Sequence, residues 1–286
     1  HALLKFSVLV WIHRPIIVLA AIDYVYFYEI EFAKYILPYP WNSKEAKIPF
    51  LWFNDIDTYS STDYTQLLAK DDLLFSQDED NTLHDFVCNI LQEADINIQD
   101  YNYDSKKLEP FANDLKMPQE LRELLNHDNG LGKAYKIEMI HRIKQTDGAY
   151  REYKLNSQEE SQGTQNLFFL SPILKDAFNQ GKILCIDEFD KSLHPMLVQY
   201  LVSLFNNPQV NRKNAQLLIS THTLDLLSSK TSRRDEIYFM QKNQETGESE
   251  LYSLDEFSTR KGADIRKGYL LGRYGAVPDI GDGNLL

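Results

Sequence analysis

The sequence has few cysteines, no excess of positive charge and no long uninterrupted apolar run. Only two of its 286 residues are cysteines, Cys88 and Cys185, and Cys185 lies inside an apolar stretch. Two such distant cysteines show no metal-ligand spacing, do not form a disulfide-stapled scaffold and favour a reducing, cytoplasmic compartment. The net charge of −12 disfavours a broad nucleic-acid-binding face, which needs clustered Lys and Arg, although a local patch at residues 233–234 or 260–261 stays open.

The apolar N-terminal region is not predicted to span a membrane. Residues 3–36 are rich in apolar and aromatic side chains, but Lys5, Arg14 and Asp23 interrupt them before about 20 apolar residues accumulate. We therefore expect no membrane partner and interpret the stretch as a helix or strand of a folded domain. The hydrophobic fraction of 43% fits a globular chain with a real core.

The most informative stretch is residues 181–190, an apolar run that ends in acidic residues. Residues 183–186 are continuously apolar, which predicts a central parallel strand covered on both faces. Ligands of parallel sheets gather where strands end, and there stand Asp187 and Glu188. An Asp at this point can hold Mg²⁺ on nucleotide phosphates, and a Glu can polarise an attacking water. For this pair alone, a solvated acidic turn stays an open alternative.

Two further segments support a phosphate site. Residues 159–165 form a polar, glycine-containing turn before an apolar stretch, which predicts a helix start with Ser161 or Thr164 as its cap. A helix N-terminus suits a phosphate. Residues 215–220 predict a second buried strand, and His222 just after it can contact a γ-phosphate.

In this order the segments resemble the ATP-binding-cassette class of ATPases. The resemblance assigns the signature motif to residues 161–164, Walker B to 183–188, the D-loop to 192–195 and the switch histidine to His222. More narrowly, residues 187–195 and 269–278 are similar to the prokaryotic abortive-infection ATPases related to the overcoming-lysogenization-defect proteins and, through their heads, to SMC proteins. The resemblance covers residues 82–280.

The resemblance implies an α/β fold, a P-loop ATPase head of the cassette type. Its sheet would be mostly parallel, flanked by helices, extended by β-hairpins and incomplete at the N-terminus. The cofactors would be ATP and Mg²⁺. By the same resemblance Asp187 would hold the metal, Glu188 would orient the attacking water, and His222 would stabilise the γ-phosphate.

The resemblance also implies a homodimer with ATP sandwiched between two heads. Ser161, Gly163 and Thr164 would then face a nucleotide held by the partner subunit. Ser192 and His194 would lie at the dimer seam, with His194 standing where cassette transporters usually carry Asp.

The sequence holds no Gly-x-x-x-x-Gly-Lys-Ser/Thr loop, whose backbone N–H groups and Lys hold the phosphates. The nearest match, residues 130–134, carries Ala134 in place of the hydroxyl residue that binds Mg²⁺, and we interpret it as a helix-ending loop with Gly130 as its cap. Because the chain starts with His1 and not Met, we expect the first strand and Walker A to lie upstream. This chain by itself would then be inactive.

The pattern predicts three parts. Residues 1–80 would be a remnant of the N-terminal lobe with an irregular insertion that holds a strand or two. Residues 81–156 would form a helical and hairpin subdomain, and residues 157–286 the ATPase core with a C-terminal extension. The expected elements are a helix at 82–96, a mobile polar segment at 101–114, a hairpin at 135–155, a helix at 195–205 and a hairpin at 236–254.

Three functions stay open. The favoured one is an ATP-driven dimer switch in phage defence that controls a separately encoded effector, and its defence role rests on resemblance alone. The second is a pseudo-ATPase or truncated binding module, which the missing Walker A keeps open. The third is a metal-dependent nuclease using Asp187, Glu188 and Asp190, which is disfavoured because the later strand ends in Ser-Thr-His and not in an Asp-x-Asp pair. The remaining histidines, His84 among them, show no metal-ligand spacing with one another.

Overall fold

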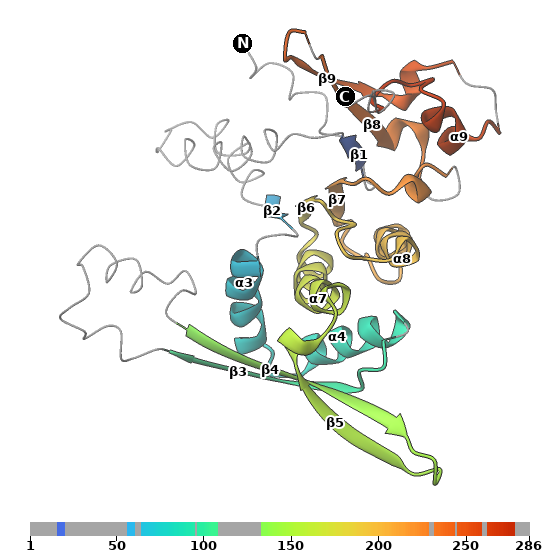
Figure 1. Ribbon diagram of the computed structural model, residues 1–286. Helices are drawn as coiled ribbons and strands as arrows, with labels where there is room; N and C mark the ends of the chain where they lie inside the picture. The colour runs from blue at the N-terminus through green and yellow to red at the C-terminus, as the bar shows by residue number, and fades with distance from the viewer. Residues whose placement is uncertain are drawn as a thin grey trace, which may run out of the picture. The chain divides into compact units, whose positions relative to one another are not determined.

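The structure is a computed structural model that describes residues 16–20, 56–60, 64–94, 96–107, 133–228, 232–243, 245–258 and 262–277 (Figure 1). The chain divides into two compact units, one made of residues 1–61 with 177–286 and one made of residues 62–176. The loop expected at residues 130–134, with Gly130 as its cap, lies outside the described residues except for the start of a strand at Lys133, and the irregular insertion expected before residue 56 lies outside them altogether.

The first unit is built on a sheet in which the described residues form six strands. The strand order is β2-β6-β7-β1-β8-β9. Neighbours from β2 to β8 run parallel, and β9 pairs antiparallel with β8 as an added hairpin. This confirms the predicted mostly parallel α/β sheet. The strands are β1 (Ile16–Ala20), β2 (Ile56–Ser60), β6 (Ile183–Asp187), β7 (Gln216–Ser220), β8 (Ile237–Lys242) and β9 (Ser249–Ser253).

The continuous apolar runs became the buried strands β6 and β7, as predicted. Leu184 and Ile186 of β6 are at most 1% exposed, and Ile219 of β7 is fully buried. The two strands pair in parallel with Ile186 opposite Ile219. Their polar ends therefore lie at the same edge of the sheet.

β1 occupies the centre of the sheet, between β7 and β8. Residues 16–20 fill the place beside β7, and the strand and Walker A loop expected upstream of residue 1 stay a prediction. From β1 the chain continues to β2, which lies on the β7 side of β1, past β6. From β7 it continues to β8, which lies on the opposite side of β1. Such a reversal of connections between neighbouring strands marks the place where open parallel sheets bind ligands, at the carboxyl ends of the strands.

The described helices of this unit include α8 (Pro195–Asn206) and α9 (Ile265–Leu270). α8 confirms the helix expected at 195–205. It begins with Pro195, whose fixed φ suits the first helical position, and it buries Val198, Leu201 and Phe205. One apolar face thus holds α8 against the unit.

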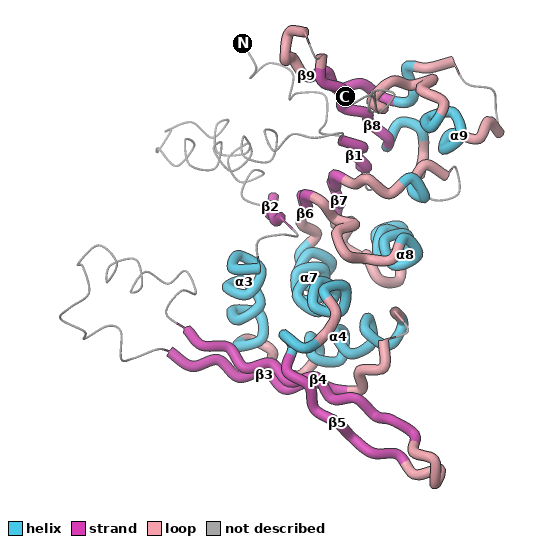
Figure 2. Tube along the Cα trace, viewed as in Figure 1, coloured by secondary structure: helices cyan, strands magenta, loops and turns pink. Residues whose placement is uncertain are grey.

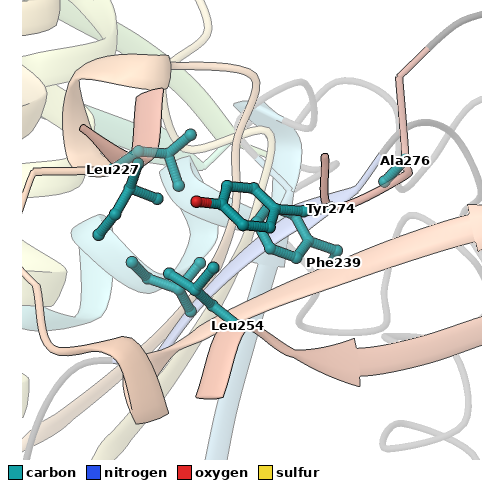
Figure 3. Packing of buried hydrophobic residues seen from close by; sticks show 7 residues of the cluster. Leu227, Phe239, Leu254, Tyr274 and Ala276 are labelled. Carbon is teal, nitrogen blue, oxygen red and sulfur yellow. The ribbon is translucent and has the colours of Figure 1, made fainter. Parts of the chain in front are cut away.

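The C-terminal part of this unit has its own hydrophobic cluster (Figure 3). Phe239 of β8 stacks on Tyr274 with ring centroids 5.7 Å apart and on Tyr269 at 5.5 Å. The hydroxyl of Tyr252 donates to the carbonyl of Tyr274 at 2.7 Å. The cluster explains the aromatic composition of residues 269–278. Its members are Leu227, Ile237, Phe239, Leu254, Ile265, Tyr274 and Ala276.

The second unit combines helices with an antiparallel sheet in the order β3-β4-β5 (Figure 2). The β4–β5 pair confirms the hairpin expected at 135–155. The described elements are α3 (Tyr64–Ser76), α4 (Thr82–Glu93), β3 (Asp100–Lys107), β4 (Lys133–Lys144), β5 (Tyr150–Asn156) and α7 (Gln162–Gln180), with the boundary between the units falling inside α7.

The prediction of a mobile polar segment from residue 101 is wrong for residues 101–107, which form most of β3. The reason is an alternation of side chains along the strand. Tyr101 is buried and Tyr103 half-buried, whereas Asn102 and Asp104 are exposed. The inward rings join an aromatic core, because Tyr101 packs edge-on against the fully buried Phe168 of α7 at 4.9 Å.

α4 confirms the amphipathic helix expected at 82–96, although it ends at Glu93. Leu83, Val87, Ile90 and Leu91 are buried at helical spacing. In the described part of the chain, no helix is both long enough and apolar enough to cross a bilayer.

Candidate functional site

The acidic end of β6 is attached to the end of β7 through one hydroxyl. Ser220, the last residue of β7, donates its Oγ–H to Oδ1 of Asp187. Oγ of Ser220 in turn accepts the backbone N–H of Glu188 at 2.9 Å. Because Ser220 is only 7% exposed, these bonds are shielded from water and fix both carboxylate residues relative to the sheet.

Glu188 is held in an unusual backbone conformation. Its φ is 50°, in the left-handed region that residues with a Cβ seldom adopt. The neighbouring Phe189 is 1% exposed and donates its N–H to the carbonyl of Ser220 at 3.1 Å, so the core anchors the turn. The Glu188 side chain stays 35% exposed and lies 3.4 Å from Nζ of Lys191. Conformations of this kind cost on the order of 1 kcal/mol and gather at functional sites.

Asp190 joins the turn after β6 to the turn after β7. Its Oδ2 accepts from the backbone N–H of His222 at 3.2 Å and from Oγ1 of Thr223 at 2.9 Å. This clamp brings the exposed His222 to the same edge as Glu188. It also weighs against a nuclease in which Asp187, Glu188 and Asp190 share a metal, because the Asp190 oxygen is already used in holding the turn.

The segment predicted to be the D-loop forms the entry to α8. Ser192 has a φ of 60° and is exposed. His194 is exposed as well, and its Nδ1 accepts the N–H of Met196 at 3.2 Å, which caps the helix. Both side chains thus lie on the surface of this unit, where a role at a dimer seam stays a prediction.

The predicted signature residues lie in the second unit, at the start of α7. Oγ of Ser161 accepts the N–H of Thr164 at 3.1 Å and bonds its hydroxyl at 2.9 Å, so Ser161 caps the helix as expected. Thr164 is 8% exposed and Gly163 half-buried, which leaves Ser161 as the outward hydroxyl. The arrangement directs the helix N-terminus, with its positive dipole end, toward the surface that carries Ser161.

A half-buried His–Glu contact that the sequence analysis missed stands next to this turn. His141 of β4 and Glu160 lie 2.6 Å apart, with side chains 15% and 9% exposed. The side-chain amide of Gln165 donates to the carbonyl of Glu160 at 2.9 Å. The β4–β5 hairpin therefore positions the residue directly before Ser161. Sequence spacing gives no signal for it, because 19 residues separate the partners.

The residues present fit Mg²⁺ better than they fit phosphate. Asp187 and Glu188 offer the carboxylate oxygens that Mg²⁺ prefers. The segment that follows β1, however, contains no glycine, and the first glycine of the whole chain is Gly130. A loop that cradles phosphate needs glycine so that its backbone can approach the phosphate closely. The carboxylates at the end of β6 are therefore present, but the sequence after β1 does not have the composition of such a loop.

A family described as "AAA domain, putative AbiEii toxin, Type IV TA system" matches residues 2–228. Since this match covers more than half of the chain, the chain belongs to that AAA-domain family. The prediction of an abortive-infection ATPase relative is thereby confirmed at the level of the family. A search of curated protein sequences found no match.

Two solved structures similar to the chain are SMC heads. One is an SMC head bound to the C-terminal winged-helix domain of ScpA, with 13% identity, 66% of this chain and 49% of that chain covered, and a TM-score of 0.36. The other is an SMC head with an extended coiled coil bound to the C-terminal domain of ScpA, derived from Pyrococcus furiosus, with 10% identity, coverage of 80% and 50%, and a TM-score of 0.34. The chain spans about half the length of each.

Proposed function

We propose that this chain is the head of an AAA-family ATPase that works as an ATP-driven dimer switch in the cytoplasm. The observation that carries the proposal is the fixed pair Asp187 and Glu188 at the carboxyl end of β6, held by Ser220 and placed at one edge with His222. Family membership supports the coarse assignment. The role in phage defence, acting on a separately encoded effector, is carried by the resemblance to abortive-infection ATPases.

In this proposal each side chain has one task. Asp187 would hold Mg²⁺, which when bound neutralises phosphate charge. Glu188, exposed enough to meet water and held in a fixed turn, would accept a hydrogen bond from the attacking water and orient it. His222 would donate to the terminal phosphate. Ser161 and Gly163 would bind the nucleotide of a partner head through the N-terminus of α7.

Light scattering tests the switch, on the chain as given and on the chain extended upstream. We expect Mg²⁺ and ATP to convert monomer into dimer, and Glu188→Gln to accumulate that dimer because hydrolysis no longer resolves it. Ser161→Arg should abolish the dimer, since a bulky side chain would block the partner's nucleotide. Glu79→Gln changes an exposed residue that is distant in sequence from both Ser161 and Glu188, and it should behave like the unchanged protein. A monomer under all conditions would contradict the proposal.

A specific observation favours a second function, a binding module without hydrolysis. β1 fills the centre of the sheet beside β7, and the sequence after it, up to β2, has no glycine with which to cradle phosphate. A head of this kind would contribute its surface to a partner without hydrolysing ATP. Dimerisation that needs no nucleotide and is indifferent to Glu188→Gln would favour this function over the first.

A further inference from the structure

Three side chains with metal-binding atoms converge in the second unit, apart from the carboxylates of β6. His84 and Cys88 lie one turn apart on α4, and Asp100 is the first residue of β3. A ring nitrogen of His84, Sγ of Cys88 and a carboxylate oxygen of Asp100 all lie within 4.8 Å of one another. The spacing of four residues puts His84 and Cys88 on one helix face. The sequence analysis missed this pairing, because it found no metal-ligand spacing between the two cysteines or between the histidines.

The backbone around the cluster is fixed by hydrogen bonds from neighbouring residues. The carboxylate of Asp78 accepts the N–H groups of Leu83 and His84 at 3.0 and 2.9 Å, which secures the start of α4. Oδ1 of Asp100 accepts the N–H of Tyr101 at 2.8 Å, which orients this carboxylate at the start of β3. The ligand atoms are therefore held near one another before any ion arrives.

The imidazole of His84 is oriented as in metal sites. Its ring stacks on Tyr101 with centroids 4.6 Å apart, and its Nε2 lies 2.8 Å from Oδ1 of Asp100. The other ring nitrogen, Nδ1, faces Oδ1 of Asp85 at 3.8 Å. A histidine that binds metal through one nitrogen usually directs the other to a carboxylate or carbonyl, which fixes the ring and raises its basicity. Asp85 lies beyond hydrogen-bond distance and would have to move closer to take that supporting role.

The ligand set and its exposure point to one metal. We propose that His84, Cys88 and Asp100 bind a Zn²⁺ ion that connects α4 to β3. Thiolate, imidazole and carboxylate together suit zinc, which takes four ligands at about 2.0 to 2.3 Å. Cys88 is 8% exposed, whereas the side chains of His84 and Asp100 are 33% and 50% exposed. The fold therefore covers Cys88, whereas solvent reaches His84 and Asp100. A water can supply the fourth ligand on that solvent-accessible side.

The consequence of this site is structural and does not depend on ATP. The residues between α4 and β3 form a short connection, and the ion would fix its two ends to each other. Zn²⁺ would stabilise the unit by binding the folded chain in preference to the unfolded one. Thermal unfolding should therefore move to higher temperature with Zn²⁺ and return with a chelator.

Co²⁺ is the probe for the test, because a thiolate bound to Co²⁺ gives a charge-transfer absorption that oxygen and nitrogen ligands do not. We expect one Co²⁺ per chain with that absorption, displaced by Zn²⁺. Cys88→Ala should abolish the absorption, and Asp100→Asn, which keeps size and leaves the thiol in place, should weaken binding at least tenfold. Cys185→Ala is the matched control, since Cys185 lies in β6 outside the cluster, and it should bind as the unchanged chain does.

Folding is checked separately, because Cys88 is buried. Circular dichroism of each variant without metal should match that of the unchanged chain, and the change His84→Gln, at a half-buried position, provides a second variant that leaves the buried Cys88 in place. Binding that lacks the charge-transfer absorption, or that persists in Cys88→Ala and in His84→Gln, would overturn the proposal. Such binding would leave the His84–Asp100 contact as an ordinary ion pair.

Discussion

At the scale of single residues, the candidate site depends on side chains that the sequence shows and on hydrogen bonds that it does not. Asp187, Glu188 and His222 could be predicted because acidic and basic residues follow apolar strands directly. The roles of Ser220 and Asp190 could not, because each bonds a residue more than 30 positions away. Such contacts depend on which strands are neighbours, and the sequence alone does not specify this.

Ser220→Ala should loosen the acidic turn. The change removes a buried hydroxyl that bonds Asp187 and the N–H of Glu188, and it leaves the backbone donor without that acceptor. We expect a loss of about 2 kcal/mol in the free energy of unfolding, measured by chemical denaturation. Ser203→Ala, which removes an exposed hydroxyl bonded to Tyr200, is the control and should cost far less. Equal losses for the two variants would show that Ser220 has no special role.

Asp71 in α3 should make stability depend on pH. It is fully buried, and its carboxylate oxygens have no hydrogen-bond partner among the described residues. Burial raises the pKa of this carboxyl well above its ordinary value, against a smaller opposing effect of Lys70. The folded state therefore holds this proton more tightly than the unfolded state, and the stability it contributes is present at low pH and lost as pH rises toward the folded pKa.

Asp71→Asn tests this dependence. As the pH rises from 4.5 to 7.5, the unfolding free energy of the variant should increase relative to that of the unchanged chain, by up to about 1.4 kcal/mol for each pH unit. Asp104→Asn, at an exposed position paired with Lys106, should show no such trend. A flat difference for Asp71→Asn would mean that the carboxyl titrates alike in both states.

At the scale of elements, long apolar runs and regular spacing were predictable, whereas an alternating polar strand was missed. β6, β7, α4 and α8 were expected close to where they form, because continuous apolar stretches or helical spacing define them. β3 was missed because its sequence, Tyr-Asn-Tyr-Asp-Ser-Lys after Asp100, is polar in composition. Its pattern of period two places Tyr101, Tyr103 and Ser105 inward, and composition by itself does not show such a pattern.

Gly268 of α9 is packed so closely that an added side chain should destabilise the protein. A Cβ at this position would lie 2.6 Å from the hydroxyl oxygen of the buried Tyr274 and 2.9 Å from two of its ring carbons. We expect Gly268→Ala to lower the free energy of unfolding by about 1 to 3 kcal/mol through overpacking. The exposed Lys267→Ala change on the same helix is the control. A stable Gly268→Ala protein would show that the Tyr274 ring can move aside.

At the scale of the whole molecule, the fold class was predictable and the order of strands was not. Alternating strands and helices indicate a parallel sheet, but they do not say that residues 16–20 lie between β7 and β8. That placement puts the carboxylates beside the point where the strand connections reverse. The sequence between β1 and β2 contains no glycine with which a loop could cradle phosphate. The central claim is thus that Asp187 and Glu188, fixed at the carboxyl end of β6, act on ATP and Mg²⁺.

Equilibrium titration with fluorescent ATP and Mg²⁺ tests this claim most directly, on the chain as given and on the chain extended upstream. The account predicts saturable binding by at least one of the two forms, with Glu188→Gln of that form binding at least as tightly while hydrolysing no ATP. Absence of binding by both forms would contradict it and leave a module without nucleotide chemistry.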